Sequence, residues 1–98
     1  MDQYQPCVYI LTNQSHSVLY IGVTTNPGAR IWQHKRKLVD GFSKKYNLDR
    51  LAWYELHTDI YTAIIREKQL KKWNRKWKIK LIESCNPDWA DLYDEIIC

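Results

Sequence analysis

Two short apolar runs near the N-terminus, each bounded by polar residues, have the pattern of β-strands. Residues 7–12 and 18–24 are rich in aliphatic and aromatic side chains, and the run between them, residues 13–17, is entirely polar. Two strands joined by a short polar loop predict a β-hairpin. Because successive side chains of a strand point to opposite faces, Tyr20 and Gly22 should share one face of the second strand.

A helix is expected directly after the hairpin. Asn26 can cap the first amides of a helix, Pro27 suits its first turn, and the helix should end near Leu38. Residues 42–47 are rich in lysine and are predicted to form a basic loop. The apolar run at residues 51–56 predicts a third strand.

The second half of the chain has the pattern of consecutive helices. Thr58 or Asp59 can cap a long helix that continues to about Lys72. A further helix is expected over residues 75–84. Apolar residues at helical spacing then predict a last short helix over residues 88–96.

This order of elements predicts an α+β fold. A small three-stranded antiparallel sheet, made of the hairpin and the third strand, should be flanked by helices in the order ββαβα, with further C-terminal helices. The 98 residues suffice for one domain with a modest core, and 45% of them are hydrophobic, with five Trp and seven Tyr. We therefore expect residues 1–98 to form a single folded domain.

The sequence holds no apolar run near the roughly 20 residues that cross a bilayer, and its first residues show no basic stretch leading into an apolar segment, so we expect no secretory leader. We expect a cytoplasmic protein without a membrane partner. Cys7, Cys85 and Cys98 are widely spaced, and the chain contains no C-x-x-C motif. This spacing favours free thiols in a reducing compartment and does not indicate a structural zinc site.

Charge is segregated along the chain. Residues 1–29 contain one charged side chain, residues 30–80 contain all fifteen Lys and Arg against five acids, and residues 81–98 contain five acids and no Lys or Arg. A local net charge of 15 − 5 = +10 over residues 30–80 indicates a surface for a polyanion, with nucleic acid as the first candidate. A solvated basic helix would produce the same pattern, so charge alone leaves both interpretations open.

Glu67 occupies an unusual position on the predicted long helix. It falls in the middle of an apolar stripe, where a carboxylate without a partner would be costly to bury. A cation or a hydrogen-bond donor is therefore expected beside it, and Lys71, four residues later, is one candidate. The apolar members of the stripe are Ile60, Ala63, Ile64 and Leu70.

Arg30 and His34 are four residues apart and therefore neighbours on one helical face. Arginine can bind two phosphate oxygens at once, and histidine can move a proton near neutral pH. Tyr9 and Tyr20 lie on adjacent predicted strands, which could bring their hydroxyls together. Taken singly, a strand tyrosine packs far more often than it catalyses, and a helical arginine is more often solvated.

Taken in order, these features resemble the GIY-YIG nuclease family, and in particular the nuclease domain of the excision-repair incision subunit. The fragment Tyr20-Ile21-Gly22 matches the family's second triplet in full. The fragment Cys7-Val8-Tyr9 has Cys7 where the family has glycine, and Val23 stands where the repair branch carries a lysine. The resemblance covers nearly the whole chain.

The resemblance implies a divalent-metal-dependent endonuclease that hydrolyses phosphodiester bonds in DNA, with DNA repair as the context. Glu67 would hold Mg²⁺ or Mn²⁺, because Mg²⁺ often binds one protein carboxylate together with water and phosphate. Arg30 would stabilise the phosphate, Tyr20 would activate the attacking water, and Tyr9 would be the hydrogen-bonding partner of Tyr20. His34 would orient the water or the phosphate.

Further residues are expected to support this site. Gly22 would allow backbone or substrate to approach closely where its strand ends, and Asn86 corresponds to an asparagine that supports the site in some relatives. A rim of basic residues beside the site is expected to track phosphates. Its members are Lys35, Arg36, Lys37, Lys44 and Lys45.

Two other functions remain open at this level. The chain could be a non-catalytic nucleic-acid-binding module of the same fold, or a protein-interaction domain that uses its aromatic side chains and acidic C-terminal segment. The DNA could be branched, nicked or single-stranded. A chain of 98 residues leaves little room for a targeting domain, so a protein partner could supply specificity.

Overall fold

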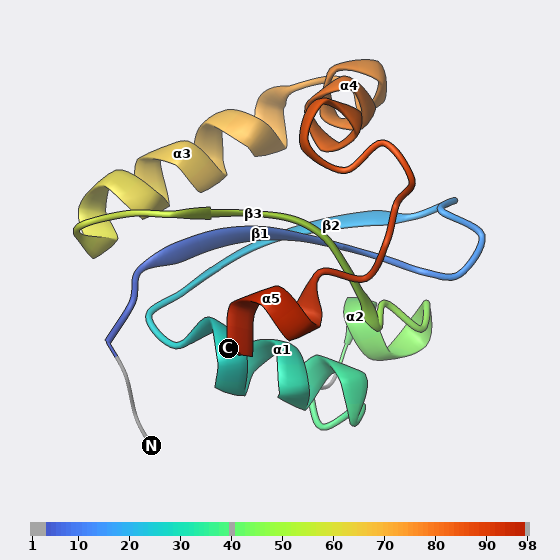
Figure 1. Ribbon diagram of the computed structural model, residues 1–98, viewed down its shortest axis with the longest axis horizontal. Helices are drawn as coiled ribbons and strands as arrows, with labels where there is room; N and C mark the ends of the chain where they lie inside the picture. Colours follow the sequence, from blue (N-terminus) through green and yellow to red (C-terminus); the bar gives the residue numbers. More distant parts are fainter. Residues whose placement is uncertain (1–3, 40, 98) are drawn as a thin grey trace.

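The computed structural model of the protein describes residues 4–39 and 41–97, and a three-stranded antiparallel sheet lies at its centre (Figure 1). Strand β1 spans Cys7–Thr12, β2 spans Leu19–Thr24 and β3 spans Arg50–Leu56. The strand order is β2-β1-β3, so β1 is central and β2 and β3 form the two edges. The predicted α+β fold, with a hairpin and a third strand, is confirmed.

Helices cover both faces of the sheet (Figure 1). Helices α3 (Ile60–Lys72) and α4 (Arg75–Cys85) lie on one face. Helices α1 (Pro27–Lys35), α2 (Phe42–Lys45) and α5 (Tyr93–Ile97) lie on the other. We call these the α3 face and the α1 face.

Alternation along β1 sends its side chains into two separate cores. Val8 and Ile10 pack with buried residues of α3 and α4, whereas Tyr9 and Leu11 pack with Ile31 of α1. All six residues of β1 are buried, as expected for a strand that is covered on both faces. The α1 face therefore carries Tyr9, and the α3 face carries the helix that contains Glu67.

The predicted helix caps are present at the start of α1 and α3. The Ala29 amide donates to Asn26 Oδ1 at 3.2 Å, and the Thr62 amide donates to Asp59 Oδ1 at 2.9 Å. Each bond satisfies one of the amides that a helix start leaves without a partner. Of the two predicted caps for the long helix, the structure selects Asp59.

The structure corrects the expected course of the chain between α1 and β3. Helix α1 ends at Lys35 rather than near Leu38, because Lys37 adopts a left-handed backbone conformation with φ of 57° in which a helix cannot continue. Residues 42–47, predicted as a loop, contain the single turn of α2. The lysines of this segment suggested that it is solvent-exposed throughout, but the side chain of Ser43 on α2 is buried.

The expected last helix over residues 88–96 is also corrected, since α5 begins only at Tyr93. The buried amide of Asn86 donates to the carbonyls of Ala52 (3.0 Å) and Ala90 (2.8 Å) and accepts from the Ala90 amide (3.0 Å). These bonds hold the segment in a non-helical path as it crosses from the α3 face to the α1 face (Figure 1). The crossing covers the outer edge of β3.

Two other expectations concern cysteines and membranes. Cys7 and Cys85 are free thiols, as expected, while Cys98 lies outside the described residues. Over residues 4–39 and 41–97, none of the helices combines the length and the apolar character needed to cross a membrane.

Candidate active site

Four of the residues expected at the site meet on the α1 face. The ring centroids of Tyr9 and Tyr20 are 6.4 Å apart, and the His34 ring lies 5.9 Å from the first and 5.7 Å from the second. The Arg30 guanidinium interacts with the Tyr9 hydroxyl. We call Tyr9, Tyr20, Arg30 and His34 the tyrosine cluster.

Local structure explains why these residues meet. In the β1–β2 register Tyr9 pairs with Gly22, two residues along β2 from Tyr20, so both tyrosines point to the α1 face. Arg30 and His34 lie one turn apart on α1, which packs against that face. Strand alternation and helical spacing together place four polar side chains around one point.

Gly22 is required by the position of Tyr9. A Cβ atom on Gly22 would lie 2.4 Å from both Cζ and Oη of the tyrosine. We expected the glycine to admit backbone or substrate, whereas the structure fills this space with the ring of Tyr9. The glycine therefore acts by positioning a site residue.

The two tyrosines differ in their surroundings. Burial raises the pKa of Tyr9 to about 12, although the hydrogen bond and positive charge of Arg30 partly offset this effect. Tyr9 therefore keeps its proton at neutral pH and serves as a hydrogen-bonding group. Tyr20 is only half-buried and is accessible from solvent.

His34 is buried, with both ring nitrogens engaged. Its Nε2 lies 3.2 Å from Tyr9 Oη, and its Nδ1 lies 2.9 Å from Ser43 Oγ. Burial and the nearby Arg30 lower the pKa of His34 to about 4, so the imidazole is neutral at pH 7. The expected contact of His34 with water or phosphate stays a prediction, and within the protein the ring bonds to Tyr9 and Ser43.

Ser43 was missed from the sequence. It is buried on α2 and links this turn to His34 of α1. A single serine between Phe42 and Lys44 matches no motif, and its partner is nine residues away, so the sequence contains no signal for the contact.

Glu67 lies on the other side of the sheet. Its side chain is 13% exposed and forms an ion pair with Lys71, with 2.7 Å between Oε2 and Nζ. Ala63 and Leu70 of the same stripe are fully buried against the α3 face, so the expected stripe is present. Among the described residues, none of the hydrogen bonds or ion pairs of Glu67 reaches the tyrosine cluster.

The expected metal centre therefore has one candidate ligand, Glu67. No group of three or more His, Cys, Asp or Glu that could hold a metal occurs within residues 4–39 and 41–97. A single carboxylate is compatible with Mg²⁺, which retains several waters and also binds substrate phosphate. The ion pair to Lys71 and the metal role remain alternatives for this carboxylate.

Lys35, expected in the phosphate-tracking rim, is engaged within the protein. Its ammonium pairs with the Asp91 carboxylate, donates to the Asp49 carbonyl at 2.7 Å and lies 5.1 Å from the centre of the Tyr93 ring. Although burial raises the pKa of Asp91, hydrogen bonds from Lys35 and two backbone amides lower it more. Lys35 thus ties α1 to the C-terminal segment, and its expected contact with phosphate stays a prediction.

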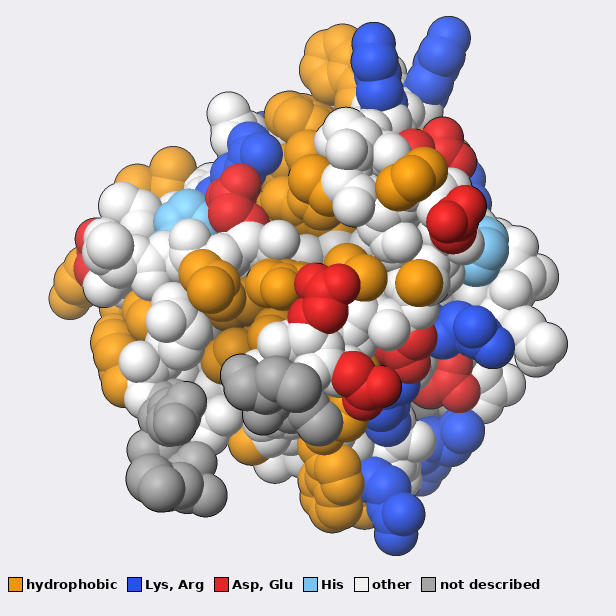
Figure 2. Space-filling model, viewed as in Figure 1, with side chains coloured by type: hydrophobic (Ala, Val, Ile, Leu, Met, Phe, Trp, Pro, Cys, Tyr) orange, Lys and Arg blue, Asp and Glu red, His pale blue; other side chains and the backbone are white. Residues whose placement is uncertain are grey.

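The remaining rim residues are exposed. The guanidinium of Arg36 lies 5.6 Å from the Trp32 ring centre, and the ammonium of Lys45 lies 5.4 Å from that of Tyr46. In Figure 2, several acidic side chains lie where the C-terminal segment crosses the sheet. The exposed members of the rim are Arg36, Lys37, Lys44 and Lys45.

Asn86, expected to support the site, forms its hydrogen bonds beside β3. Within residues 4–39 and 41–97, its side chain bonds to backbone groups of Ala52 and Ala90, at the edge of β3. The tyrosine cluster lies around β1 and β2. The structure therefore does not bring Asn86 and the cluster together.

Comparisons with known proteins show which family this chain is similar to. The family model described as the GIY-YIG catalytic domain matches residues 5–80. A UPF0213 protein of Staphylococcus haemolyticus is 36% identical over 80 residues, which cover 78% of this chain and 92% of the relative. No solved structure matches. Residues 5–80, which the family model matches, include the tyrosine cluster and Glu67 but not Asn86.

Proposed function

Because the chain belongs to the GIY-YIG family, we propose that it is a divalent-metal-dependent endonuclease that hydrolyses phosphodiester bonds in DNA. A GIY-YIG catalytic domain implies a nuclease-type function and nucleic-acid binding. The metal dependence, the DNA substrate and the mechanism are additional parts of our proposal. The tyrosine cluster carries this proposal, because it gathers a guanidinium and two phenols, of which Arg30 and Tyr20 are partly exposed.

Arg30 would bind the scissile phosphate. Its guanidinium contacts Tyr9 and donates to Gln33 at 3.3 Å, which orients it and leaves further N–H donors for phosphate oxygens. A planar cation that binds two oxygens at once stabilises the charge that builds up on the phosphate during hydrolysis. This role requires an accessible arginine, and Arg30 is only half-buried.

Tyr20 would accept the proton of the attacking water. It is the more exposed of the two tyrosines, whereas Tyr9 is buried and retains its proton. Tyr9 would hold Arg30 and Tyr20 in place, with its own hydroxyl oriented by His34 and Ser43. Each side chain thus has a role that its burial permits.

Glu67 would provide the protein ligand for Mg²⁺ or Mn²⁺. When bound, the metal would neutralise negative charge on the phosphate. Helix α3 and the tyrosine cluster lie on opposite faces of the sheet. A DNA strand that contacts both would therefore pass along the outer edge of β2. This edge is suited to the task, since β2 carries Tyr20 and α3 packs against it.

A nuclease assay with three variants tests the proposal. Parent protein with Mg²⁺ or Mn²⁺ should cut at least one DNA in a panel of nicked, branched, single-stranded and duplex substrates. Glu67→Gln and Arg30→Ala should each lose about two to three orders of magnitude in cutting rate, the typical cost of one electrostatic stabiliser. Both variants should still bind DNA.

Lys71→Met is the matched control for Glu67→Gln. It breaks the same ion pair but leaves the carboxylate in place, so cutting should be retained. If both substitutions reduce stability slightly and neither affects cutting, Glu67 is only an ion-pair partner. A parent protein that binds DNA but cuts nothing with either metal would support the non-catalytic module.

A further inference from the structure

Three aromatic rings form a row that leads away from the tyrosine cluster. The Phe42 ring stacks against Tyr20 with centroids 6.2 Å apart and planes at 25°, and Tyr46 lies 4.7 Å from Phe42. Phe42 is 49% exposed and Tyr46 is 39% exposed. We call Tyr20, Phe42 and Tyr46 the aromatic row.

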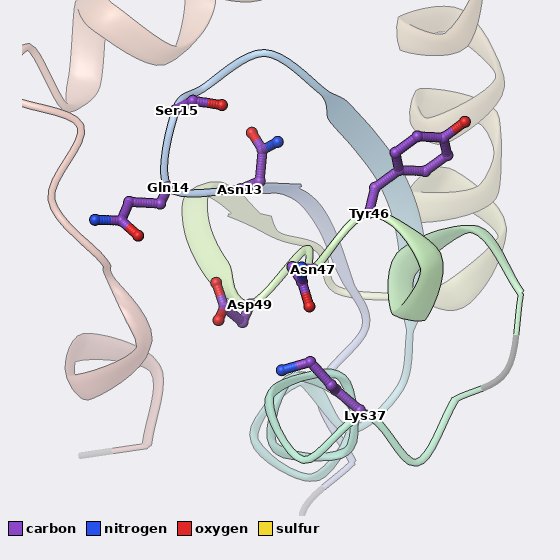
Figure 3. A pocket seen from close by; sticks show the side chains of 7 residues that line it. All are labelled: Asn13, Gln14, Ser15, Lys37, Tyr46, Asn47 and Asp49. Carbon is purple, nitrogen blue, oxygen red and sulfur yellow. The ribbon is translucent and has the colours of Figure 1, made fainter.

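A polar groove of about 600 Å³ continues from the end of this row. Figure 3 shows that its side chains come from the β1–β2 loop, the segment after α1 and the turn between α2 and β3. These groups include both hydrogen-bond donors and acceptors, as the edges of nucleobases require. The groove is lined by Asn13, Gln14, Ser15, Lys37, Tyr46, Asn47 and Asp49.

Cationic residues adjoin these aromatic residues in the sequence and at the groove. Lys44 and Lys45 are exposed on α2 between Phe42 and Tyr46, and Lys37 reaches the groove from the end of α1. Lys45 lies over the Tyr46 ring. Exposed rings interleaved with cations are the arrangement by which proteins hold the bases and phosphates of a single strand.

We propose that the aromatic row and the polar groove form a base-stacking subsite for an unpaired nucleic-acid strand. One base beside the scissile phosphate stacks on Phe42, and the next reaches Tyr46 and the groove. Duplex bases are stacked on one another and present no face to a protein ring, so the occupant is unpaired. The inference rests on the proposed function, because Tyr20 belongs both to the row and to the proposed catalytic machinery.

Binding in the absence of metal tests the subsite separately from catalysis. Fluorescence anisotropy with chelator present compares a labelled ten-nucleotide thymidine strand, an abasic strand of the same length and a duplex. Parent protein should bind the thymidine strand most tightly. Phe42→Leu and Tyr46→Leu should each weaken that binding roughly 5- to 100-fold, and leave abasic binding unchanged.

Tyr61→Leu is the matched control, because Tyr61 is 76% exposed on α3 and distant in sequence from the row. It should leave all three affinities unchanged. Thermal unfolding checks that each variant folds. Should a variant not fold, quenching of 2-aminopurine in the single strand by the parent protein reports stacking directly, and no quenching would overturn the subsite.

Equal affinity of the parent for the thymidine and abasic strands, or tighter binding of the duplex, would also overturn the subsite. Failure of the proposed function looks different. A parent that cuts nothing, yet loses thymidine-strand binding on Phe42→Leu, would refute the nuclease and keep the subsite. If the parent cuts DNA and Phe42→Leu binds every strand as tightly as the parent does, the nuclease is kept and the subsite is refuted.

Discussion

The ring of Tyr9 occupies the space that a side chain at Gly22 would need. The two residues pair directly across β1 and β2, and a Cβ atom on Gly22 would approach Tyr9 Cζ to 2.4 Å. Real Cβ contacts are not this short, so either the ring or the strand would have to move. Through Tyr9, this contact also fixes the hydroxyl that meets Arg30 and His34.

Gly22→Ala should therefore destabilise the protein and disturb the site. Forcing one methyl group into a packed interior typically costs about 1–3 kcal/mol. The free energy of unfolding, measured with denaturant, should fall by that amount. Because Tyr9 is displaced, DNA cutting should fall as well.

A double-mutant cycle provides the control. Tyr9→Leu removes the ring that the new methyl group would meet, so Gly22→Ala should cost much less in that background. The coupling should exceed about 0.5 kcal/mol, as expected for residues in contact. Additive effects of the two substitutions would contradict the relationship.

Local pattern was sufficient to predict part of this arrangement. The two-residue period of β-strands placed Tyr20 and Gly22 on one face. Capping chemistry located the start of α1 at Asn26 and narrowed the start of α3 to Thr58 or Asp59. These features depend on neighbours in sequence. They are therefore visible before the chain is folded.

Contacts between distant segments could not be predicted in the same way. Ser43 meets His34 only because α2 folds back onto α1. The helical spacing of Trp89 and Leu92 predicted one apolar stripe, yet Trp89 packs on the α3 face and Leu92 on the α1 face. An apolar period does not distinguish a helix from a segment that crosses between two cores.

The side chain of Glu67 shows a different limit. Its place in an apolar stripe predicted a partner correctly, and the structure pairs it with Lys71. A carboxylate in this position can exchange an ammonium for a metal ion without any change in the pattern around it. Sequence periodicity therefore identifies the position but cannot choose between the two partners.

The buried His34 should make stability depend on pH. Its pKa is about 4 in the folded protein, below the ordinary value of 6.5, so the unfolded chain binds a proton first as pH falls. The contribution of His34 to the free energy of unfolding should therefore be fully present above about pH 6.5. It should be lost progressively as the pH falls from about 6.5 to 4. The contribution is at most about 3 kcal/mol, from about 1.4 kcal/mol per pKa unit.

His34→Gln isolates this contribution from the other titrating groups. Glutamine can hydrogen-bond to both Tyr9 and Ser43 but does not titrate. Denaturant unfolding of parent and variant across pH 4 to 7.5 should show a shallower pH dependence in the variant. Parallel curves would contradict the assignment of a lowered pKa to His34.

The last prediction separates the exposed rim from Lys35. Substituting all four rim residues by glutamine should weaken DNA binding and flatten its dependence on salt, because each lost phosphate contact reduces the slope by about 0.9 for duplex DNA. Lys35→Met should leave that slope unchanged, since its ammonium already pairs with Asp91. The four residues are Arg36, Lys37, Lys44 and Lys45.

Lys35→Met should act on stability instead. Loss of its ion pair and of its hydrogen bond to the Asp49 carbonyl should lower the free energy of unfolding by about 1–2 kcal/mol, given the partial exposure of the pair. Asp91→Asn is the matched control and should produce a loss of similar size. If Lys35→Met reduces the salt slope as much as a rim substitution does, Lys35 contacts phosphate and its ion pair opens when DNA binds.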